Sequence, residues 1–280
     1  MESSNNIDIV FIGGGIMASC IVNAVVASGY TSKDNIGINV RTQKSCDAWK
    51  QKGFTNTFIS KDDLFKKVQP KYVFLCIKPQ LYEEVCTELG NSLGKHNGPI
   101  KFISIMAGIT MEQLRRSFNN TVPDYSITRA MPNLPCQIQR GTTLLCSTLK
   151  SDELSVIKEI IECTGTVVEI DEKYFNVGSV LSGSAPAFLF TIIDALADGG
   201  CKNGLSKGDS LKLVASAFNG AAEMILQLGE HPMALKDKVC SAGGTTIAGI
   251  AELEKHGFRN ILIETVTAST QRAKELGAPK

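Results

Sequence analysis

The sequence predicts an α/β fold in which a sheet-forming N-terminal region is followed by an entirely helical C-terminal region. Three observations lead to this prediction. Residues 7–12 form a short β-branched run that leads into a glycine-rich turn and then a helical pattern, which is typical of the first strand of a doubly wound sheet. Short apolar runs of the same kind recur up to residue 170. From Asp171 onward the apolar residues follow helical spacing, so we expect two domains, residues 1–170 and residues 171–280.

The turn after the first strand carries the glycine pattern of a dinucleotide site. It reads G-x-G-x-x-A, and the helical pattern that follows continues to Gly29, which is suited to ending a helix. Gly13 permits the tight strand-to-helix turn, Gly15 lets the backbone approach a pyrophosphate, and Ala18 keeps the helix close to the strand. A purely structural turn is the alternative, but the position between strand and helix favours a Rossmann-type dinucleotide-binding domain. The residues expected to contact the cofactor here are Gly13, Gly14, Gly15, Ile16, Met17 and Ala18.

The second strand, residues 36–40, ends in a basic segment. In an NAD site an Asp or Glu commonly binds the ribose 2′-hydroxyl near this point, but this chain has Arg41, Thr42 and Lys44. A guanidinium and an ammonium can hold a 2′-phosphate through charge-assisted hydrogen bonds. An ordinary solvated loop is the alternative. The segment therefore favours NADP, with NADPH preferred and NADH possible, and we expect Arg41, Thr42 and Lys44 to contact the cofactor.

Two further strands end at the same predicted edge of the sheet. Residues 72–77 lead into Lys78-Pro79, and residues 102–106 lead into Ala107-Gly108. Ligands of doubly wound sheets bind beyond the carboxyl ends of the strands, so we expect Lys78, Pro79, Ala107 and Gly108 to lie at the cofactor. Pro79 is also suited to opening the next helix.

A stiff loop follows the next strand, residues 125–129. In this loop, residues 130–135, an asparagine stands between two prolines. It lies at the same edge of the sheet, where it either lines the nicotinamide pocket or simply reverses the chain. Two more strands, residues 142–146 and 166–170, complete the predicted sheet.

The helical region contains long helices with much apolar surface. Residues 187–197 are apolar nearly all round, so they should be buried within the domain or against another subunit. Residues 211–228 form a second helix rich in alanine, with Ser206 or Asp209 as its cap. The final helices are expected at residues 246–255 and 260–276. So much apolar helix surface predicts an all-α dimerisation domain.

A run of small residues, residues 240–249, lies between two helical patterns near the C-terminus. Its glycines let the backbone approach a ligand, and the hydroxyls of Ser241, Thr245 and Thr246 are short, uncharged hydrogen-bonding groups. Backbone N–H groups at the start of the following helix favour a carboxylate. The alternative is a glycine-rich helix–helix turn capped by threonine.

Composition excludes several other classes of protein. The formal charge of +1 gives no argument for a nucleic-acid or acidic-membrane partner. Nine scattered cysteines without a CxxC pair indicate a reducing compartment, with no disulfide framework and no metal site. Met1 to Asn6 lack the features of a secretory signal, and no apolar stretch reaches the roughly 20 residues of a membrane span, so a cytoplasmic protein is expected. The histidines, His96, His231 and His256, are expected to be surface or capping residues.

Along nearly its whole length the chain resembles the pyrroline-5-carboxylate reductase family. The most specific matching segment runs from Leu235-Lys236-Asp237 through Ser241-Ala242-Gly243-Gly244-Thr245-Thr246. The other matching segments are residues 11–18, Ile77-Lys78-Pro79-Gln80, residues 129–135, Leu181-Ser182-Gly183-Ser184-Ala185-Pro186-Ala187 and residues 194–200. The resemblance implies reduction of 1-pyrroline-5-carboxylate to L-proline with NADPH or NADH, the final step of proline biosynthesis. It also implies a Rossmann domain followed by an all-α dimerisation domain, in dimers that commonly assemble in fives.

The resemblance also assigns a substrate site to the small-residue run. It implies that the loop from Ser241 to Thr246, including Gly243, Gly244 and Thr245, holds the substrate carboxylate and ring nitrogen. The chemistry agrees, because a protonated cyclic imine accepts hydride without a strong protein acid, so the site needs mainly geometry. Thr246 suits the hydrogen bond near the nitrogen, as the catalytic residue, while the backbone N–H groups of Gly244 and Thr245 suit the carboxylate clamp.

Two departures from the family pattern keep other functions open. The family usually has proline where this chain has Ala242, and glycine where it has Ala185. A catalytically weak dinucleotide-binding module is therefore one alternative. The other is an NADP-dependent dehydrogenase of the β-hydroxyacid type, which would need a lysine or histidine base from the second domain, with Lys202 and Lys207 as candidates.

Overall fold

The computed structural model describes residues 8–93, 96, 98–118 and 121–277. The segment from Met1 to Asn6, and the first residue of the expected first strand, lie outside the described residues. The chain divides into two compact units, Met1–Ser184 with Thr270–Lys280, and Ala185–Ser269. The predicted domain boundary at Asp171 follows the last strand, whereas this division falls later, before Ala185.

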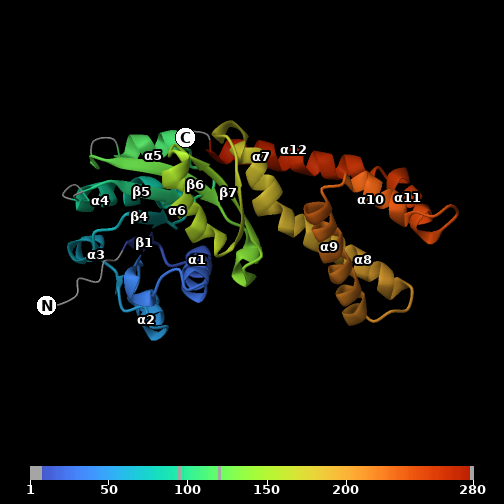
Figure 1. Ribbon diagram of the computed structural model, residues 1–280, viewed down its shortest axis with the longest axis horizontal. Coiled ribbons are helices and arrows are strands. Elements are labelled where there is room, and N and C mark those ends of the chain that lie inside the picture. Colours follow the sequence, from blue (N-terminus) through green and yellow to red (C-terminus); the bar gives the residue numbers. More distant parts are fainter. Residues whose placement is uncertain (1–7, 94–95, 97, 119–120, 278–280) are drawn as a thin grey trace. The chain divides into compact units, whose positions relative to one another are not determined.

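The strands of the first unit form one eight-stranded sheet in the order β3-β2-β1-β4-β5-β6-β7-β8 (Figure 1). Neighbouring strands are parallel, except for the antiparallel pair β6 and β7. The strand order reverses direction at β1, as in a Rossmann fold, so the predicted fold class is confirmed. The strands are β1 (Ile9–Ile12), β2 (Ile36–Asn39), β3 (Thr57–Phe58), β4 (Tyr72–Leu75), β5 (Ile100–Ser104), β6 (Tyr125–Met131), β7 (Gly141–Ser147) and β8 (Gly165–Glu169).

Helices cover both faces of this sheet. One hydrophobic cluster joins the strands to α3, α4 and α5, and the other joins them to α1, α2 and α6. Side chains alternate along each strand, so Val10 of β1 belongs to the first cluster and Phe11 to the second. These helices are α1 (Ile16–Ala27), α2 (Gln43–Gln51), α3 (Lys61–Lys67), α4 (Tyr82–Leu93), α5 (Met111–Phe118) and α6 (Ser151–Glu162).

Local signals in the sequence mark several of these helix ends. Gly29 has φ of 76°, a left-handed conformation that stops the chain from continuing α1. Thr42 caps α2, since its Oγ1 accepts a hydrogen bond from the Ser45 N–H at 3.2 Å. Pro79 begins the 3₁₀ turn η2 (Pro79–Leu81), which leads directly into α4, as the sequence predicts.

The described residues after β8 contain helices and no strand, which confirms the predicted helical half. Ser206 caps α9, because its Oγ accepts from the Asp209 N–H at 3.1 Å. Helix α12 begins at Phe258 rather than at Asn260, directly after Gly257 in the left-handed region. These elements are η4 (Glu172–Tyr174), α7 (Phe175–Ser179), the π-helical turn η5 (Val180–Ser184), α8 (Ala185–Lys202), α9 (Lys207–Leu228), α10 (Pro232–Val239), α11 (Thr245–Lys255) and α12 (Phe258–Gly277).

The helical unit has almost no core of its own. Among the described residues of α8 to α12, the buried ones are Ala197 and Ser210, while Phe190 is 55% exposed and Leu213 61% exposed. Of the two expectations for residues 187–197, burial within the domain is therefore wrong.

The expectation that no apolar stretch is long enough for a membrane span needs correction. The helical run Glu172–Lys202 includes an 18-residue window with mean hydropathy 1.6, which suffices by length and composition.

Candidate functional site

The strands that precede the predicted cofactor residues end at the same level of the sheet. Ile12 of β1 pairs with both Asn39 and Leu75, and Leu75 pairs with Ser104. The glycine turn, the Arg41 segment, Lys78-Pro79 and Ala107-Gly108 therefore all follow one edge of the sheet, on both sides of the strand at which the order reverses.

Gly13 makes the strand-to-helix turn possible. Its φ is 102°, and an added Cβ would overlap the carbonyl oxygen of Cys76. Its N–H donates to the carbonyl of Asn39 at 2.8 Å. Because the backbones of β1, β2 and β4 meet at this residue, only glycine fits here.

Gly14 is held by a contact that the sequence analysis missed. The indole Nε1 of Trp49, in α2, donates to the Gly14 carbonyl at 3.3 Å, and an added Cβ at Gly14 would overlap that nitrogen. Trp49 is the only tryptophan of the chain, and it is buried. The sequence places Trp49 in the helix after the second strand, but its hydrogen bond to Gly14 depends on how that helix packs on the sheet, which the local pattern does not specify.

Gly15 faces open space at the N-terminus of α1. It is the N-cap with φ of −77°, and no heavy atom lies within 4 Å of an added Cβ. The first intrahelical hydrogen bond runs from the Ser19 N–H to the Gly15 carbonyl at 2.9 Å. The amides of Ile16, Met17 and Ala18 therefore have no acceptor within the helix. The first turn carries no acidic residue. This arrangement suits a bound anion such as a pyrophosphate.

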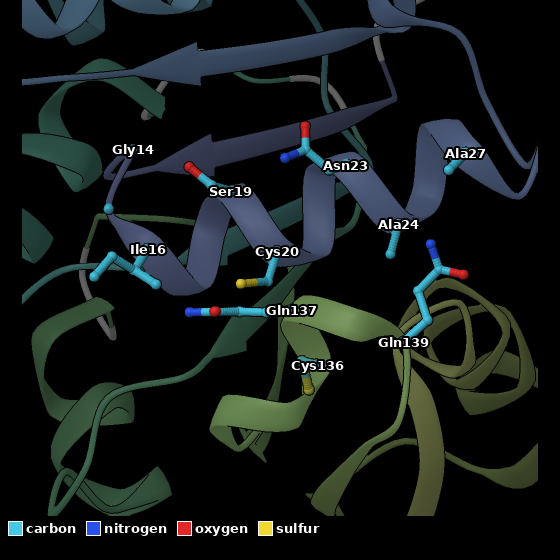
Figure 2. Close-up of a pocket in the computed structure, with 11 residues that line it drawn as sticks. Gly14, Ile16, Ser19, Cys20, Asn23, Ala24, Ala27, Cys136, Gln137 and Gln139 are labelled. Atoms are coloured by element: carbon cyan, nitrogen blue, oxygen red, sulfur yellow. The ribbon is translucent and has the colours of Figure 1, made fainter. Parts of the chain in front are cut away.

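A pocket of about 590 Å³ extends from this turn along α1 toward the 3₁₀ helix η3 (Leu134–Ile138). Figure 2 shows Cys20 and Ala24 on the side of α1 that faces Gln137 and Gln139. The glycine turn was predicted to line a site, whereas the η3 side was missed. The lining residues are Gly14, Gly15, Ile16, Ser19, Cys20, Asn23, Ala24, Ala27, Cys136, Gln137 and Gln139.

The Cys20 thiol in this pocket remains uncharged at neutral pH. Burial raises the pKa of Cys20, and the nearby Cys136 raises it further. A neutral thiol places no negative charge beside the turn that is suited to phosphate.

The cations predicted to bind the cofactor are exposed. Arg41, Lys44 and Lys78 form no ion pair with a carboxylate of the described residues, and none of them lines the pocket beside α1. The Thr42 hydroxyl is partly engaged, since it caps α2 and donates to Ser45 Oγ at 2.9 Å. The positive charge of Arg41, Lys44 and Lys78 is therefore available at this edge of the sheet for an anionic ligand.

In the second unit, the small-residue loop joins α10 to α11. Gly243 has φ of 66° and Gly244 is the N-cap of α11, without a side-chain cap. The loop is thus a glycine-rich turn between two helices, but the predicted threonine cap is wrong, because Gly244 caps α11. One part of the predicted clamp also needs correction, because the Gly244 N–H already donates to the Ser241 carbonyl at 3.1 Å. The first intrahelical bond runs from Ala248 N–H to Gly244, which leaves the amides of Thr245, Thr246 and Ile247 for a ligand.

The hydroxyls of this loop are available for binding. Ser241, Thr245 and Thr246 form no side-chain hydrogen bond with another described residue. Ser241 and Thr245 are exposed, and Thr246 is half-buried. Ala242 and Ala185 add no backbone strain, since Gln139 is the only non-glycine residue with positive φ in the described part of the chain. The two departures therefore leave the backbone of both segments unstrained.

Of the candidate bases Lys202 and Lys207, the structure engages Lys207 in ion pairs, and the ring of His231 is also engaged. His231 Nδ1 accepts from the Met233 N–H at 3.2 Å and so caps α10, as expected for a capping residue. Lys207 Nζ lies 2.6 Å from an oxygen of Asp194 and 2.5 Å from one of Asp198. These hydrogen bonds raise the pKa of Lys207 above its usual range, so its amine stays protonated. Within the described ranges, no group of His, Cys, Asp and Glu side chains is arranged to hold a metal ion.

Comparison with known proteins gives two family matches. Residues 172–276 match the model for pyrroline-5-carboxylate reductase dimerisation, and residues 8–108 match the model for NADP oxidoreductase, coenzyme F420-dependent. The chain is 36% identical to a pyrroline-5-carboxylate reductase of Synechocystis, over 97% of this chain and 99% of that protein.

Solved structures agree with these matches. A pyrroline-5-carboxylate reductase of Coxiella burnetii superposes with a TM-score of 0.87 at 32% identity, covering 97% of this chain and 99% of that one. A pyrroline carboxylate reductase of Plasmodium falciparum with NADP bound gives a TM-score of 0.83 at 26% identity, covering 98% and 99%.

Proposed function

The chain belongs to the pyrroline-5-carboxylate reductase family, and we propose from this membership that it reduces 1-pyrroline-5-carboxylate to L-proline with NADPH, the last step of proline biosynthesis. The observation that carries the proposal is similarity to such reductases along nearly the whole chain, in the sheet region and in the helical region alike. NADH is a possible second cofactor.

The first unit provides the features expected of an NADP site. The open N-terminus of α1 at Gly15 supports binding of the pyrophosphate by the amides of Ile16 to Ala18. Arg41 and Lys44, which are exposed and pair with no carboxylate in the described part of the chain, support binding of the 2′-phosphate. When bound, the nicotinamide cofactor supplies the hydride.

The second unit provides groups suited to the substrate. The amides of Thr245, Thr246 and Ile247 at the start of α11 hold the carboxylate, where the helix dipole favours a negative charge. The Thr246 hydroxyl accepts or donates a hydrogen bond at the ring nitrogen and so orients the C=N bond. Because the imine is readily protonated, these positions suffice without a histidine or lysine base.

A steady-state assay with 1-pyrroline-5-carboxylate, against NADPH and NADH in parallel, tests this function. We expect oxidation of NADPH that depends on the substrate, with proline as the product. Cofactor binding without turnover would instead indicate the weak binding module, and oxidation of hydroxy acids by NADP would indicate the β-hydroxyacid dehydrogenase.

We propose that the protein is a homodimer assembled through its helical unit, and that five such dimers can assemble further into a decamer. The exposed apolar helices α8 and α9 support a second copy as the partner that covers them, and the family model over residues 172–276 describes dimerisation. A second copy also accounts for the apolar run Glu172–Lys202 without a membrane. A cytoplasmic location agrees with the nine free cysteines.

Dimerisation gives a testable expectation about dilution. If α8 and α9 are covered only in the assembly, no stable folded monomer exists, and stability depends on protomer concentration. Light scattering over a dilution series should show a dimer or larger species for as long as the protein is active. A fully active, folded monomer at low concentration would contradict this interface.

The choice of cofactor gives a second expectation. Replacing Arg41 with alanine removes a charged hydrogen bond to the 2′-phosphate, so KM for NADPH should rise about 10- to 100-fold. KM for NADH should change little, because NADH has no phosphate there. Lys50→Ala, in the last turn of α2, is a matched control for general loss of positive charge. Equal effects of Arg41→Ala on both cofactors would show that Arg41 does not contact the 2′-phosphate.

A further inference from the structure

One buried side chain links three segments beyond the carboxyl end of β6. Asn133 lies between the two prolines of the loop and is 8% exposed. Its Nδ2 donates to the Ser182 carbonyl at 3.0 Å, and its Oδ1 accepts from the Thr142 N–H at 2.9 Å. The amide thereby joins the end of β6 to the start of β7 and to the π-helical turn η5.

The carbonyl that Asn133 binds cannot be paired in the ordinary helical way. In an α-helix, the Ser182 carbonyl would accept from the N–H of residue 186, but Pro186 has no N–H. A buried carbonyl without a donor is costly, and Ser182 is 8% exposed. The Asn133 side chain supplies a donor in place of the N–H that Pro186 lacks. Because Pro186 stands four residues after Ser182, the Ser182 carbonyl has no α-helical donor, and the Asn133 side chain donates to it instead.

The linked segments lie at the edge of the sheet where the cofactor is expected to bind. β6 is adjacent to β5, whose carboxyl end leads to Ala107-Gly108, and the Met131 side chain at the end of β6 lies against Gly183 of η5. The same helical segment is tied at a second point, because Glu172 accepts from Arg129 at 3.2 Å and from the Met111 N–H at 2.9 Å. Glu172 thus attaches η4 to that edge of the sheet, and Asn133 attaches η5 to it.

We propose that Asn133 is a positioning residue for the reduction, a role that rests on the proposed function. Its amide sets the loop of residues 132–135 and the turn η5 in one arrangement, and this arrangement fixes the part of the first unit that is expected to line the nicotinamide pocket. The loop therefore does more than reverse the chain. Misplacement of reacting groups by about 1 Å can cost about 100-fold in rate, even when the altered residue touches neither reactant.

The first test is Asn133→Ala in the full-length protein. We expect kcat with 1-pyrroline-5-carboxylate to fall about 10- to 100-fold, while the Kd for NADPH, measured by direct titration, stays within about twofold because the turn at Gly15 and Arg41 are untouched. Asn203→Ala removes another asparagine-to-carbonyl bond, 2.8 Å to Gly199, and should leave kcat unchanged. An unchanged kcat for Asn133→Ala would overturn the proposal.

The second test is a double-mutant cycle with Pro186→Ala. This substitution returns an N–H to residue 186 and offers the Ser182 carbonyl a donor within the helix. In that background, Asn133→Ala should lower kcat and the melting temperature clearly less than it does alone. Additive effects of the two changes would show that the hydrogen bond to Ser182 is not the reason for the loss.

The outcomes separate this inference from the proposed function. If the unmodified protein does not reduce 1-pyrroline-5-carboxylate, the proposed function fails, but the cycle in melting temperature still tests the link between Asn133 and Ser182. If it does reduce the substrate and Asn133→Ala is as active, only the inference fails. Should Asn133→Ala not fold, Asn133→Asp keeps the acceptor for Thr142, while its ionised carboxylate cannot donate to the Ser182 carbonyl and adds a negative charge there, so an unchanged kcat with the carboxylate ionised would again contradict the proposal.

Discussion

Replacing Gly15 with alanine should weaken NADPH binding by about 100-fold while the protein stays folded. The backbone of Gly15, with φ of −77°, is accessible to alanine, and its Cβ would meet no protein atom. Fold stability should change by less than about 1 kcal/mol, because alanine restricts the unfolded chain but is a poorer N-cap than glycine. The added methyl group instead occupies the approach of the pyrophosphate to the helix N-terminus. Titration of cofactor binding and thermal unfolding, measured side by side, check both parts.

Gly13→Ala is the matched control, because its added methyl group should destabilise the fold rather than block the cofactor. Here φ is 102° and the methyl group would overlap the Cys76 carbonyl, so unfolding should become easier by at least about 2 kcal/mol. If Gly15→Ala binds NADPH as tightly as the unmodified protein does, the pyrophosphate does not lie on this turn.

Replacing Thr246 with alanine should lower kcat for 1-pyrroline-5-carboxylate about 10- to 100-fold and leave NADPH affinity nearly unchanged. The hydroxyl has no partner among the described residues, and Gly244 is the N-cap of α11, so removal of a helix cap would not explain the loss. A hydrogen bond to the ring nitrogen would orient the imine and stabilise the charge redistribution during hydride transfer. Steady-state kinetics at saturating NADPH measures the effect.

Two neighbouring substitutions control for other causes. Thr246→Ser keeps the hydroxyl and should retain much more activity than Thr246→Ala. Thr245→Ala should be largely tolerated, because the backbone amide of Thr245 rather than its side chain serves the carboxylate. Full activity of Thr246→Ala would mean that the loop acts through its backbone alone.

The sequence predicts those parts of the fold that depend on local patterns. The β-branched run before Gly13, the proline that opens the turn at Pro79 and the serine cap of α9 each depend on neighbours within a few residues. β3 was missed because two residues, Thr57 and Phe58, are too short to show any alternation.

The missed parts of the candidate site depend on residues far apart in the chain. The contacts of Trp49 with Gly14 and of Asn133 with Ser182 join residues that only the tertiary fold brings together. The η3 side of the pocket was missed for the same reason, because its residues lie far from α1 in the sequence. The prediction for the Gly244 N–H was wrong for a local reason, since the turn at Gly243 directs that amide to the Ser241 carbonyl, and this depends on backbone angles that composition does not specify. The assignment of the site residues stays a prediction until the variants are measured.

The hydrogen bond between Trp49 and Gly14 gives the protein a built-in optical probe. The chain has one tryptophan, so its indole fluorescence comes from a single place, and that place touches the turn on which the pyrophosphate is expected to bind. Indole emission depends on the polarity and hydrogen bonding around the ring, so cofactor binding should change its intensity or wavelength without any added label. Stopped-flow recording of this emission would give association and dissociation rates for NADPH separately from turnover, and the same signal would show whether Gly15→Ala slows binding or speeds release.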